Sequence, residues 1–171
     1  MLKNSNENIA LPDFELPLVA ADAQKTINLK SLITDNADNA NNKGLILYFY
    51  PKDNTQGCSV QAIDFSADVA AFDALGYRII GVSRDGVKSH QNFISKKQLS
   101  IELISDGDEK LCQHYDVIKE KMMYGKAHLG VVRSTFVYDK TGQMIGSFRN
   151  VKAKEHAANL LSFLQQYTQS I

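Results

Sequence analysis

An uninterrupted apolar run at residues 45–50 constrains the fold of this chain more than any other feature. Pro51 follows the run, a polar turn comes next, and Cys58 then opens a segment rich in apolar residues. A short apolar run that ends at a proline, which has no N–H to donate, predicts a buried strand. The segment after the turn predicts a helix over residues 57–75. A buried strand that passes through one turn into a helix indicates an α/β fold.

The rest of the chain continues this alternation of strands and helices. The pattern predicts, in order, a hairpin from residues 14–18 and 26–29, a strand at 77–82, a helix from 83, a strand at 101–104, a helix at 108–115, a hairpin from 134–138 and 143–148, and a helix at 153–167. This order indicates a thioredoxin-like α/β sandwich in which helices flank a central mixed sheet. We predict a single domain over residues 1–171, with a flexible N-terminus at 1–8 and a mobile Asn- and Asp-rich loop at 35–42.

Length, charge and cysteine content narrow the classes of function. A chain of 171 residues that is 44% hydrophobic can bury one substantial core. Nineteen basic and nineteen acidic residues cancel, so no electrostatic footprint for nucleic acid or a membrane surface is present. Residues 1–8 are polar, and no apolar run approaches membrane-spanning length. With only two cysteines, these features predict a cytoplasmic protein whose cysteines serve chemistry rather than a structural disulfide.

Cys58 stands where a thiolate would be stable. A helix N-terminus carries a partial positive charge and unpaired N–H groups, and both stabilise an anionic sulfur. Thr55 supplies a hydroxyl that accepts from a thiol, donates to an incoming oxygen, or simply caps the helix. Gly57 has no side chain, so the backbone N–H groups near Cys58 are open to a small ligand. The segment therefore predicts a nucleophilic thiol with a small, oxygen-bearing substrate.

Residues 49–58, Phe-Tyr-Pro-Lys-Asp-Asn-Thr-Gln-Gly-Cys, resemble the active-site signature Pro-x-x-x-Thr-x-x-Cys of the peroxiredoxins. They are most similar to the peroxiredoxin Q, or bacterioferritin-comigratory protein, subfamily, which typically reads Phe-Tyr-Pro-x-Asp-x-Thr-Pro-Gly-Cys. Gln56 stands in place of the second proline of that pattern. The resemblance runs from about residue 9 to the C-terminus, with further matches at residues 12–14, 81–83, 103–106, 124–126 and 132–136.

The resemblance implies a thioredoxin-fold peroxidase that needs no metal, haem, flavin or nicotinamide. It assigns Cys58 as the peroxidatic cysteine, and Pro51, Thr55 and Arg133 complete the site, with Gly57 beside the bound peroxide. Arg133 also fits this chemistry by itself, because a guanidinium is always charged, stabilises a thiolate and donates to a peroxide oxygen. The implied reaction reduces hydrogen peroxide and organic hydroperoxides through a cysteine sulfenic acid. Thioredoxin is the family's usual reductant, with glutaredoxin or glutathione as alternatives, and we expect a monomer or a weak dimer.

Each of these residues also has a plain structural interpretation. A lone cysteine after a strand is usually a small buried apolar residue, Thr55 alone would be a helix cap, and Arg133 alone a surface residue. Their combination favours the peroxidase.

Two rival classes of protein remain. One is a thiol–disulfide oxidoreductase, whose expected Cys-x-x-Cys is absent because Gln61 occupies the second cysteine position. The other is a redox or binding module that lacks peroxidase turnover.

The partner thiol found in many relatives is missing from this chain. A resolving cysteine five residues after the peroxidatic one would stand at Ile63, and one on the following helix would stand near Ile94. We expect Ile63 to be packed, because it and Val60 give the helix a second apolar face. The other thiol, Cys112, would need local unwinding to bring its Cα within the roughly 4.4–6.8 Å of a disulfide. We therefore predict a one-cysteine mechanism, with Cys112 as the resolving cysteine in the alternative.

Other motifs predict no further site. Cys112-x-His114 offers two metal ligands without a second pair at useful spacing, so no metal site is expected. The Gly-x-Gly-x-x-Gly and Gly-Lys-Ser/Thr phosphate-binding loops are absent. Residues 119–121 predict a solvated charged turn, and residues 122–124 are interpreted as packing residues at the rim of the site.

Overall fold

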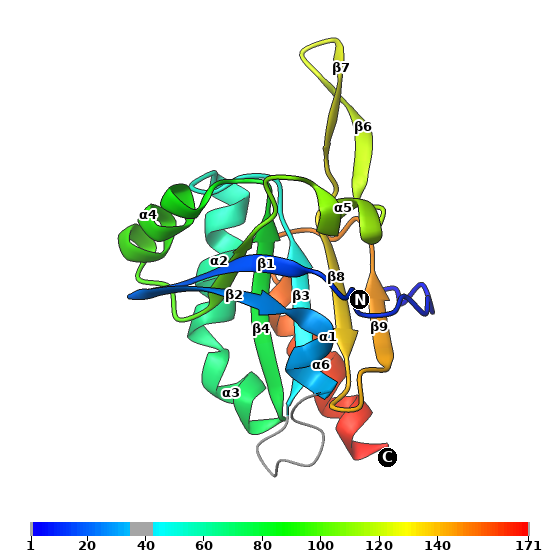
Figure 1. The fold of residues 1–171 in the computed structure, drawn as a ribbon. Coiled ribbons are helices and arrows are strands. Elements are labelled where there is room, and N and C mark those ends of the chain that lie inside the picture. The colour runs from blue at the N-terminus through cyan, green and yellow to red at the C-terminus, as the bar shows by residue number, and fades with distance from the viewer. Residues whose placement is uncertain (1, 35–42, 171) are drawn as a thin grey trace.

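The computed structural model describes residues 2–34 and 43–170, so the loop predicted at 35–42 lies outside the described residues. In that part of the chain, a seven-stranded sheet in the order β2-β1-β5-β4-β3-β8-β9 forms the centre of the molecule (Figure 1). The strands are β1 (Glu15–Ala20), β2 (Ala23–Asn28), β3 (Gly44–Phe49), β4 (Tyr77–Ser83), β5 (Glu102–Ser105), β6 (Ile118–Met123), β7 (Lys126–Val131), β8 (Ser134–Tyr138) and β9 (Met144–Phe148). The helices are α1 (Leu29–Thr34), α2 (Gln56–Ala67), α3 (Val69–Ala74), α4 (Val87–Lys97), α5 (Lys110–His114) and α6 (His156–Gln169).

The sheet is mixed, as predicted. Strands β3, β4 and β5 run parallel, whereas β1 and β8 are antiparallel to their neighbours β5 and β3. All residues of β3 are buried, which agrees with the apolar run from which this strand was predicted. Because β3 and β4 are parallel, both end at the same edge of the sheet, where Pro51 and the start of α2 follow.

Two apolar cores lie on opposite faces of this sheet. Tyr48 of β3 and Phe65 of α2 belong to one core, together with residues of α3, α4 and α6. Phe49 of β3 and Cys112 of α5 belong to the other, together with residues of α1. Tyr48 and Phe49 are adjacent in the chain, and successive side chains of a strand point to opposite faces. We call these two layers the α2 core and the α5 core.

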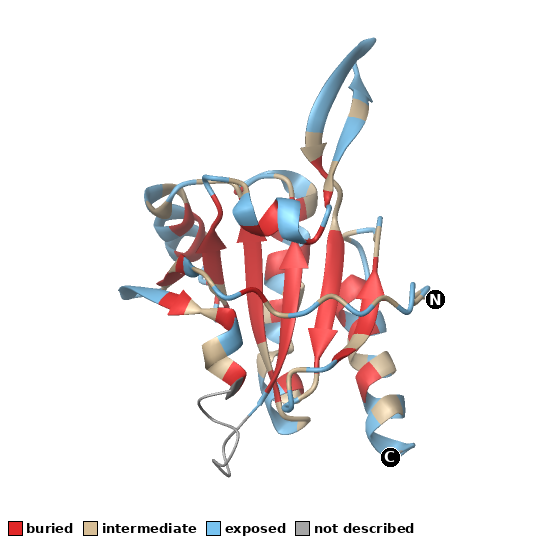
Figure 2. Cartoon of the chain, turned by 45° about the vertical axis from the view of Figure 1, so that its right-hand side comes forward, coloured by how far each residue is buried: buried red, intermediate tan, exposed pale blue. Residues whose placement is uncertain are grey.

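Strands β6 and β7 form a separate hairpin that projects from the body of the molecule (Figures 1 and 2). Its ladder runs from Ile118 paired with Val131 to Met123 paired with Lys126. The prediction of a charged turn followed by packing residues is wrong here, since Met122 is 70% exposed and Tyr124 is 96% exposed. The hairpin escaped prediction because most of its side chains face solvent, so no pattern of burial marks its strands.

A smaller difference from the predictions concerns a helix. The helix expected over 57–75 is divided at Asp68 into α2 and α3. Near the N-terminus, Ser5 N–H donates to the carbonyl of Ser147 at 2.8 Å. Arg149 donates to the two carboxylate oxygens of Glu7, at 2.9 Å each. These contacts connect residues 5 and 7 to β9 and to the residue that follows it.

Candidate active site

Cys58 lies in the first turn of α2, just after the loop that follows β3. Thr55 is the N-cap residue, with extended backbone, and Ser59 N–H donates to its carbonyl at 2.8 Å. The N–H groups of a helix before this first bond have no intrahelical acceptor, so the positive end of the helix dipole lies beside the sulfur. Cys58 is only 2% exposed and packs within the α2 core.

Arg133, which is distant from Cys58 in the sequence, contacts its sulfur. Its Nη2 lies 3.4 Å from Cys58 Sγ, within hydrogen-bonding distance for sulfur. Strand β8 makes this possible, because Ser134 pairs with Phe49 and so places residue 133 next to the loop after β3. The structure thus brings together two of the predicted site residues, 75 positions apart in the chain.

Gln61 is a site residue that sequence reasoning missed. It is fully buried one turn after Cys58, and its Oε1 accepts a hydrogen bond from Arg133 Nη1 at 2.6 Å. One end of the guanidinium is therefore held by Gln61 while the other end contacts the sulfur. The sequence carries one signal that indicates Gln61: it is a polar residue three positions after Cys58, and residues i and i+3 share one face of a helix.

Gly57 makes room for Arg133, a role that differs from the predicted one. A Cβ added at residue 57 would lie 3.3 Å from Arg133 Nη2 and 3.7 Å from the Cβ of Ala153. The first distance is shorter than about nine in ten Cβ contacts in proteins, so a side chain here would push the guanidinium by a few tenths of an ångström. The absence of a side chain at Gly57 therefore helps Arg133 to approach Cys58.

Thr55 and Pro51 lie at the outer edge of this arrangement. Thr55 is exposed, and its Oγ1 donates to the carbonyl of Lys52 at 2.8 Å rather than capping α2. Its oxygen lone pairs stay available as acceptors. Pro51 is half-buried and, together with Arg133, lines a cavity of about 760 Å³ that extends to Lys121 on β6.

Burial sets the charge of several ionisable groups near the sulfur. Burial and, to a smaller extent, the charge of Arg133 together lower the pKa of His156 to about 4, so this imidazole is neutral near pH 7. Burial, followed by Arg133, also lowers the pKa of Lys121. Burial raises the pKa of the Tyr48 hydroxyl well above its ordinary value, with the charge of Cys58 adding to this effect. Arg133 is thus the fixed positive charge in contact with the sulfur.

Cys112 lies in the α5 core, on the opposite face of the sheet from Cys58. It is fully buried, and its backbone N–H donates to Asp106 Oδ2 at 2.8 Å. Burial raises the pKa of the Cys112 thiol well above its ordinary value, and the Asp106 carboxylate raises it further.

The two positions where relatives carry a resolving cysteine differ in exposure. Ile63 on α2 is 44% exposed, so the prediction that it packs is wrong, as it is for Val60 at 39%. Ile94 on α4 is buried in the same core as Cys58. The structure therefore separates Cys58 from Cys112 by the full thickness of the sheet and brings apolar side chains, rather than a thiol, to the two expected positions.

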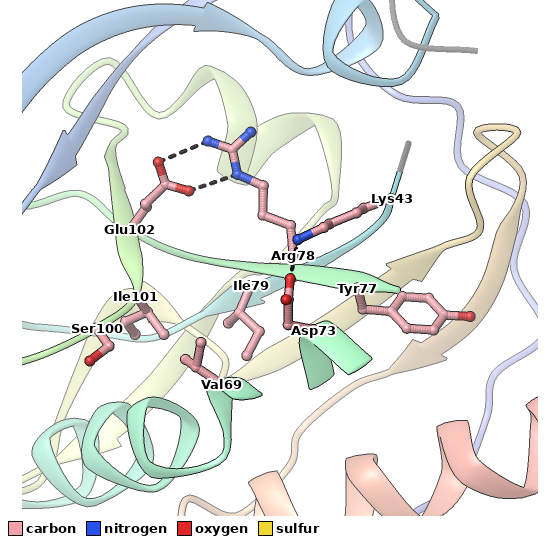
Figure 3. Close-up of a pocket in the computed structure, with 9 residues that line it drawn as sticks. All are labelled: Lys43, Val69, Asp73, Tyr77, Arg78, Ile79, Ser100, Ile101 and Glu102. Atoms are coloured by element: carbon pink, nitrogen blue, oxygen red, sulfur yellow. Dashed lines mark hydrogen bonds and ion pairs between the residues drawn. The ribbon is translucent and has the colours of Figure 1, made fainter. Parts of the chain in front are cut away.

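A second hollow, of about 260 Å³, lies at the other end of the sheet, where β4 begins (Figure 3). Its charged side chains pair with each other: Arg78 Nε lies 2.7 Å from Glu102, and Lys43 contacts Asp73. Within residues 2–34 and 43–170, no three His, Cys, Asp or Glu side chains are grouped as metal ligands would be. No helix in the same ranges is both long and apolar enough to cross a membrane.

Known proteins share this fold. The AhpC/TSA family matches residues 8–146. Peroxiredoxin Bcp of Xanthomonas campestris is 50% identical over 123 residues, which are 72% of this chain and 77% of that protein. Peroxiredoxin Bcp of Bacillus subtilis is 42% identical over 127 residues, or 74% of this chain and 81% of that protein. The solved structure of Xanthomonas campestris peroxiredoxin Q has a TM-score of 0.78 at 42% identity and covers 91% of both chains. The chain therefore belongs to the AhpC/TSA family.

The relatives named above are peroxiredoxins of the Q, or Bcp, type. The thioredoxin-like fold and the class of thiol-dependent peroxidase predicted from the sequence are confirmed by this membership. Other solved relatives include Xanthomonas campestris peroxiredoxin Q with either of two cysteines replaced by serine. Another is the bacterioferritin comigratory protein of Xanthomonas campestris, in a trapped intermediate and ligand complex that concerns its alkyl peroxide reduction activity.

Proposed function

We propose that Cys58 reduces peroxides by a one-cysteine mechanism. The observation that carries this proposal is the contact of 3.4 Å between Arg133 Nη2 and Cys58 Sγ at the N-terminus of α2. A guanidinium and a helix N-terminus both stabilise a thiolate, which is the reactive form of cysteine. Cys112 lies in the other core and is surrounded by groups that keep its thiol protonated.

In the first half-reaction, the Cys58 thiolate attacks one oxygen of the peroxide, and a sulfur–oxygen bond forms as the O–O bond breaks. The leaving oxygen takes up a proton and departs as water or as an alcohol. The Thr55 hydroxyl and the first N–H groups of α2 hold the peroxide, and Arg133 stabilises the charge that develops on the leaving oxygen. Pro51 forms one wall of the approach. Cys58 is left as a sulfenic acid.

In the second half-reaction, an external thiol attacks the sulfenic sulfur, which releases water and forms a mixed disulfide. A second thiol attacks that disulfide and returns Cys58 to its starting state. We propose thioredoxin as the reductant, with glutaredoxin or glutathione as alternatives. The isoleucines at positions 63 and 94 and the burial of Cys112 on the opposite face support an external thiol.

The proposed substrates are hydrogen peroxide and organic hydroperoxides. The cavity of about 760 Å³ beside Arg133, which Met122 and Val151 also line, supports a substrate larger than hydrogen peroxide. The alkyl peroxide reduction named for the Xanthomonas campestris relative points the same way. We propose that the protein is a single domain, acts as a monomer or weak dimer, and works in a reducing compartment such as the cytoplasm. Both cysteines are free, which supports such a compartment.

The test measures the consumption of hydrogen peroxide and cumene hydroperoxide by the purified protein, with either the thioredoxin system or glutathione as reductant. Turnover of both peroxides is expected, and Cys112→Ser should keep at least about half of the wild-type rate. Loss of thioredoxin-dependent turnover in a folded Cys112→Ser protein would support the two-cysteine alternative. Peroxide consumption with no thiol reductant able to sustain it would contradict the proposed cycle.

A further inference from the structure

Asp53 lies in the loop between β3 and α2 and is only 5% exposed. Its Oδ1 accepts a hydrogen bond from the hydroxyl of Tyr50 at 2.6 Å. Its Oδ2 accepts from Ser89 Oγ at 2.8 Å and lies 2.7 Å from Nδ1 of His90. Three partners thus converge on one buried carboxylate, an arrangement that satisfies an ionised aspartate.

His90, in the first turn of α4, is fully buried, and both of its ring nitrogens face acceptors. Nε2 lies 2.9 Å from the carbonyl oxygen of Ile104, which can only accept, so Nε2 carries a hydrogen. Nδ1 lies 2.7 Å from Asp53 Oδ2, at the other side of the ring. His90 therefore bridges the Asp53 carboxylate and the Ile104 carbonyl inside the protein, and we call His90 and Asp53 the buried His–Asp pair.

This pair joins the loop after β3 to α4 and β5. The backbone N–H of Asp53 donates to Asp85 Oδ2 at 2.9 Å, and the same oxygen accepts from Ser83 Oγ at 2.6 Å. Residue 53 is thus fixed through both its side chain and its backbone.

The peroxide-binding part of the loop begins two residues later. Asn54 has a left-handed backbone with φ of +61°, and Thr55, at the N-cap position of α2, follows it, so Asn54 alone separates the fixed residue from Thr55. Any displacement of Asp53 is passed to Thr55 and to the first turn of the helix, because only one residue lies between. A misplacement of about 1 Å at a reacting site can cost about 10²-fold in rate.

We propose that His90 is a positioning residue for peroxide reduction. It acts through Asp53 to hold Thr55 and the first N–H groups of α2 where they receive the peroxide. This inference rests on the proposed function of Cys58 and of the loop. It differs from a general structural role, because a residue that only stabilises the fold would not select between two reactions of the same sulfur.

The test compares two reactions of Cys58 in a Cys112→Ser background, in which Cys58 provides the sole thiol. Stopped-flow mixing with hydrogen peroxide measures the reaction that needs the loop, and alkylation by iodoacetamide measures the sulfur without it. In His90→Gln, the rate constant with peroxide should fall by about 10- to 100-fold, while the alkylation rate should change by less than about 3-fold. Asp53→Asn should behave in the same way. The double variant should be about as slow as the slower single variant, because both residues act through one contact.

His114→Gln is the matched control, since His114 Nε2 also contacts a backbone carbonyl, that of Ala10 at 2.7 Å, but on the surface. Its peroxide rate should equal that of the parent. If His90→Gln does not fold, Ser89→Ala removes one bond to the same carboxylate from a half-buried position. Ser89→Ala should slow the peroxide reaction by about 2- to 5-fold with alkylation unchanged.

Three outcomes separate the explanations. A parental peroxide rate in folded His90→Gln, or in Ser89→Ala where the former does not fold, would overturn the positioning role. Equal losses in the peroxide and alkylation rates would overturn it too, because they indicate a general structural effect. A parent protein whose Cys58 does not react with peroxide at all would instead refute the proposed function.

Discussion

The two cysteines of this chain occupy the same position in their helices and yet have different surroundings. Cys58 is the third residue of α2 and Cys112 is the third residue of α5, and both are buried. In α5, the carboxylate of Asp106 accepts from the N–H groups of Leu111 and Cys112, at 3.0 and 2.8 Å. A negative charge thus occupies the place where the helix would otherwise stabilise an anion.

At the start of α2 the opposite arrangement is found. The side chain of Thr55 does not cap the helix, and the guanidinium of Arg133 lies 3.4 Å from the sulfur of Cys58. Neither burial nor a helix N-terminus alone therefore distinguishes a reactive cysteine from an inert one. The difference lies in whether the first-turn N–H groups are already occupied and in the sign of the neighbouring charge.

The largest expected effect comes from replacing the sulfur of Cys58 by oxygen, and the same replacement at Cys112 is the comparison. Cys58→Ser should lower thiol-dependent peroxide consumption by at least about 10³-fold, because the nucleophile is lost. Cys112→Ser should change it by less than about 2-fold. Peroxide consumption by the two folded variants, checked by circular dichroism, is the measurement. Substantial activity in a folded Cys58→Ser protein would contradict the assignment of Cys58 as the nucleophile.

The effect of removing the positive charge beside Cys58 comes next in size. Arg133→Ala should slow the reaction of Cys58 with peroxide by about 10²- to 10³-fold, because a positioned donor and a fixed charge are lost. Arg133→Lys keeps the charge but not the planar fork that contacts both Cys58 and Gln61, so it should lie between the parent and Arg133→Ala. Stopped-flow rates near those of the parent in both variants would show that Arg133 is not part of the machinery.

The hydroxyl of Thr55 is expected to matter less. Thr55→Val keeps the shape of the side chain and removes the hydrogen-bonding oxygen, and we expect a slowing of about 10- to 100-fold in the peroxide reaction. Thr55→Ser is the matched control and should retain most of the rate. The same loss in both variants would indicate that the methyl group, rather than the hydroxyl, has the important role.

The smallest predicted effect is that of Cys112 on the free energy of unfolding at alkaline pH. Burial, and then Asp106, raise the pKa of Cys112 well above its ordinary value of 9.0. Above about pH 9, the unfolded chain releases this proton while the folded chain retains it, so the free energy of unfolding decreases as pH rises. The contribution approaches about 1.4 kcal/mol per pH unit.

Urea denaturation at about pH 8, 9 and 10 checks this sign. Cys112→Ser lacks the titrating thiol, so its free energy of unfolding should fall less than that of the parent over this range. The same slope in both proteins would mean that Cys112 titrates normally in the folded state, and the contrast with Cys58 would then be weaker than described.

The parts of the fold that were predictable are those whose side chains meet a core. The run at residues 45–50 became β3 because a strand buried on both faces leaves an unmistakable apolar pattern. The hairpin of β6 and β7 was missed because its backbone pairs while its side chains stay in water. Val60 and Ile63 were expected inside and lie outside, since periodicity shows that a helix has an apolar face but not whether a neighbour covers it.

The candidate site was predictable where it is contiguous in the chain. Residues 51–58 carry their chemistry in one segment, and Arg133 was placed by resemblance to a family. Gln61 and the pair formed by Asp53 and His90 were missed, because their roles depend on contacts between residues as many as 72 positions apart. Such contacts leave no local pattern in a single sequence.

The most direct test of the contrast between the two cysteines is the time-resolved intact mass of the protein after one equivalent of hydrogen peroxide, followed by peptide mapping. We predict the gain of one oxygen atom on Cys58 within the first time points, persistence of this sulfenic acid until a thiol is added, and an unmodified Cys112. A rapid loss of two hydrogens, with a peptide that links Cys58 to Cys112 within one chain, would contradict the account. Such a disulfide would require local unfolding that brings the two cysteines, now on opposite faces of the sheet, into contact.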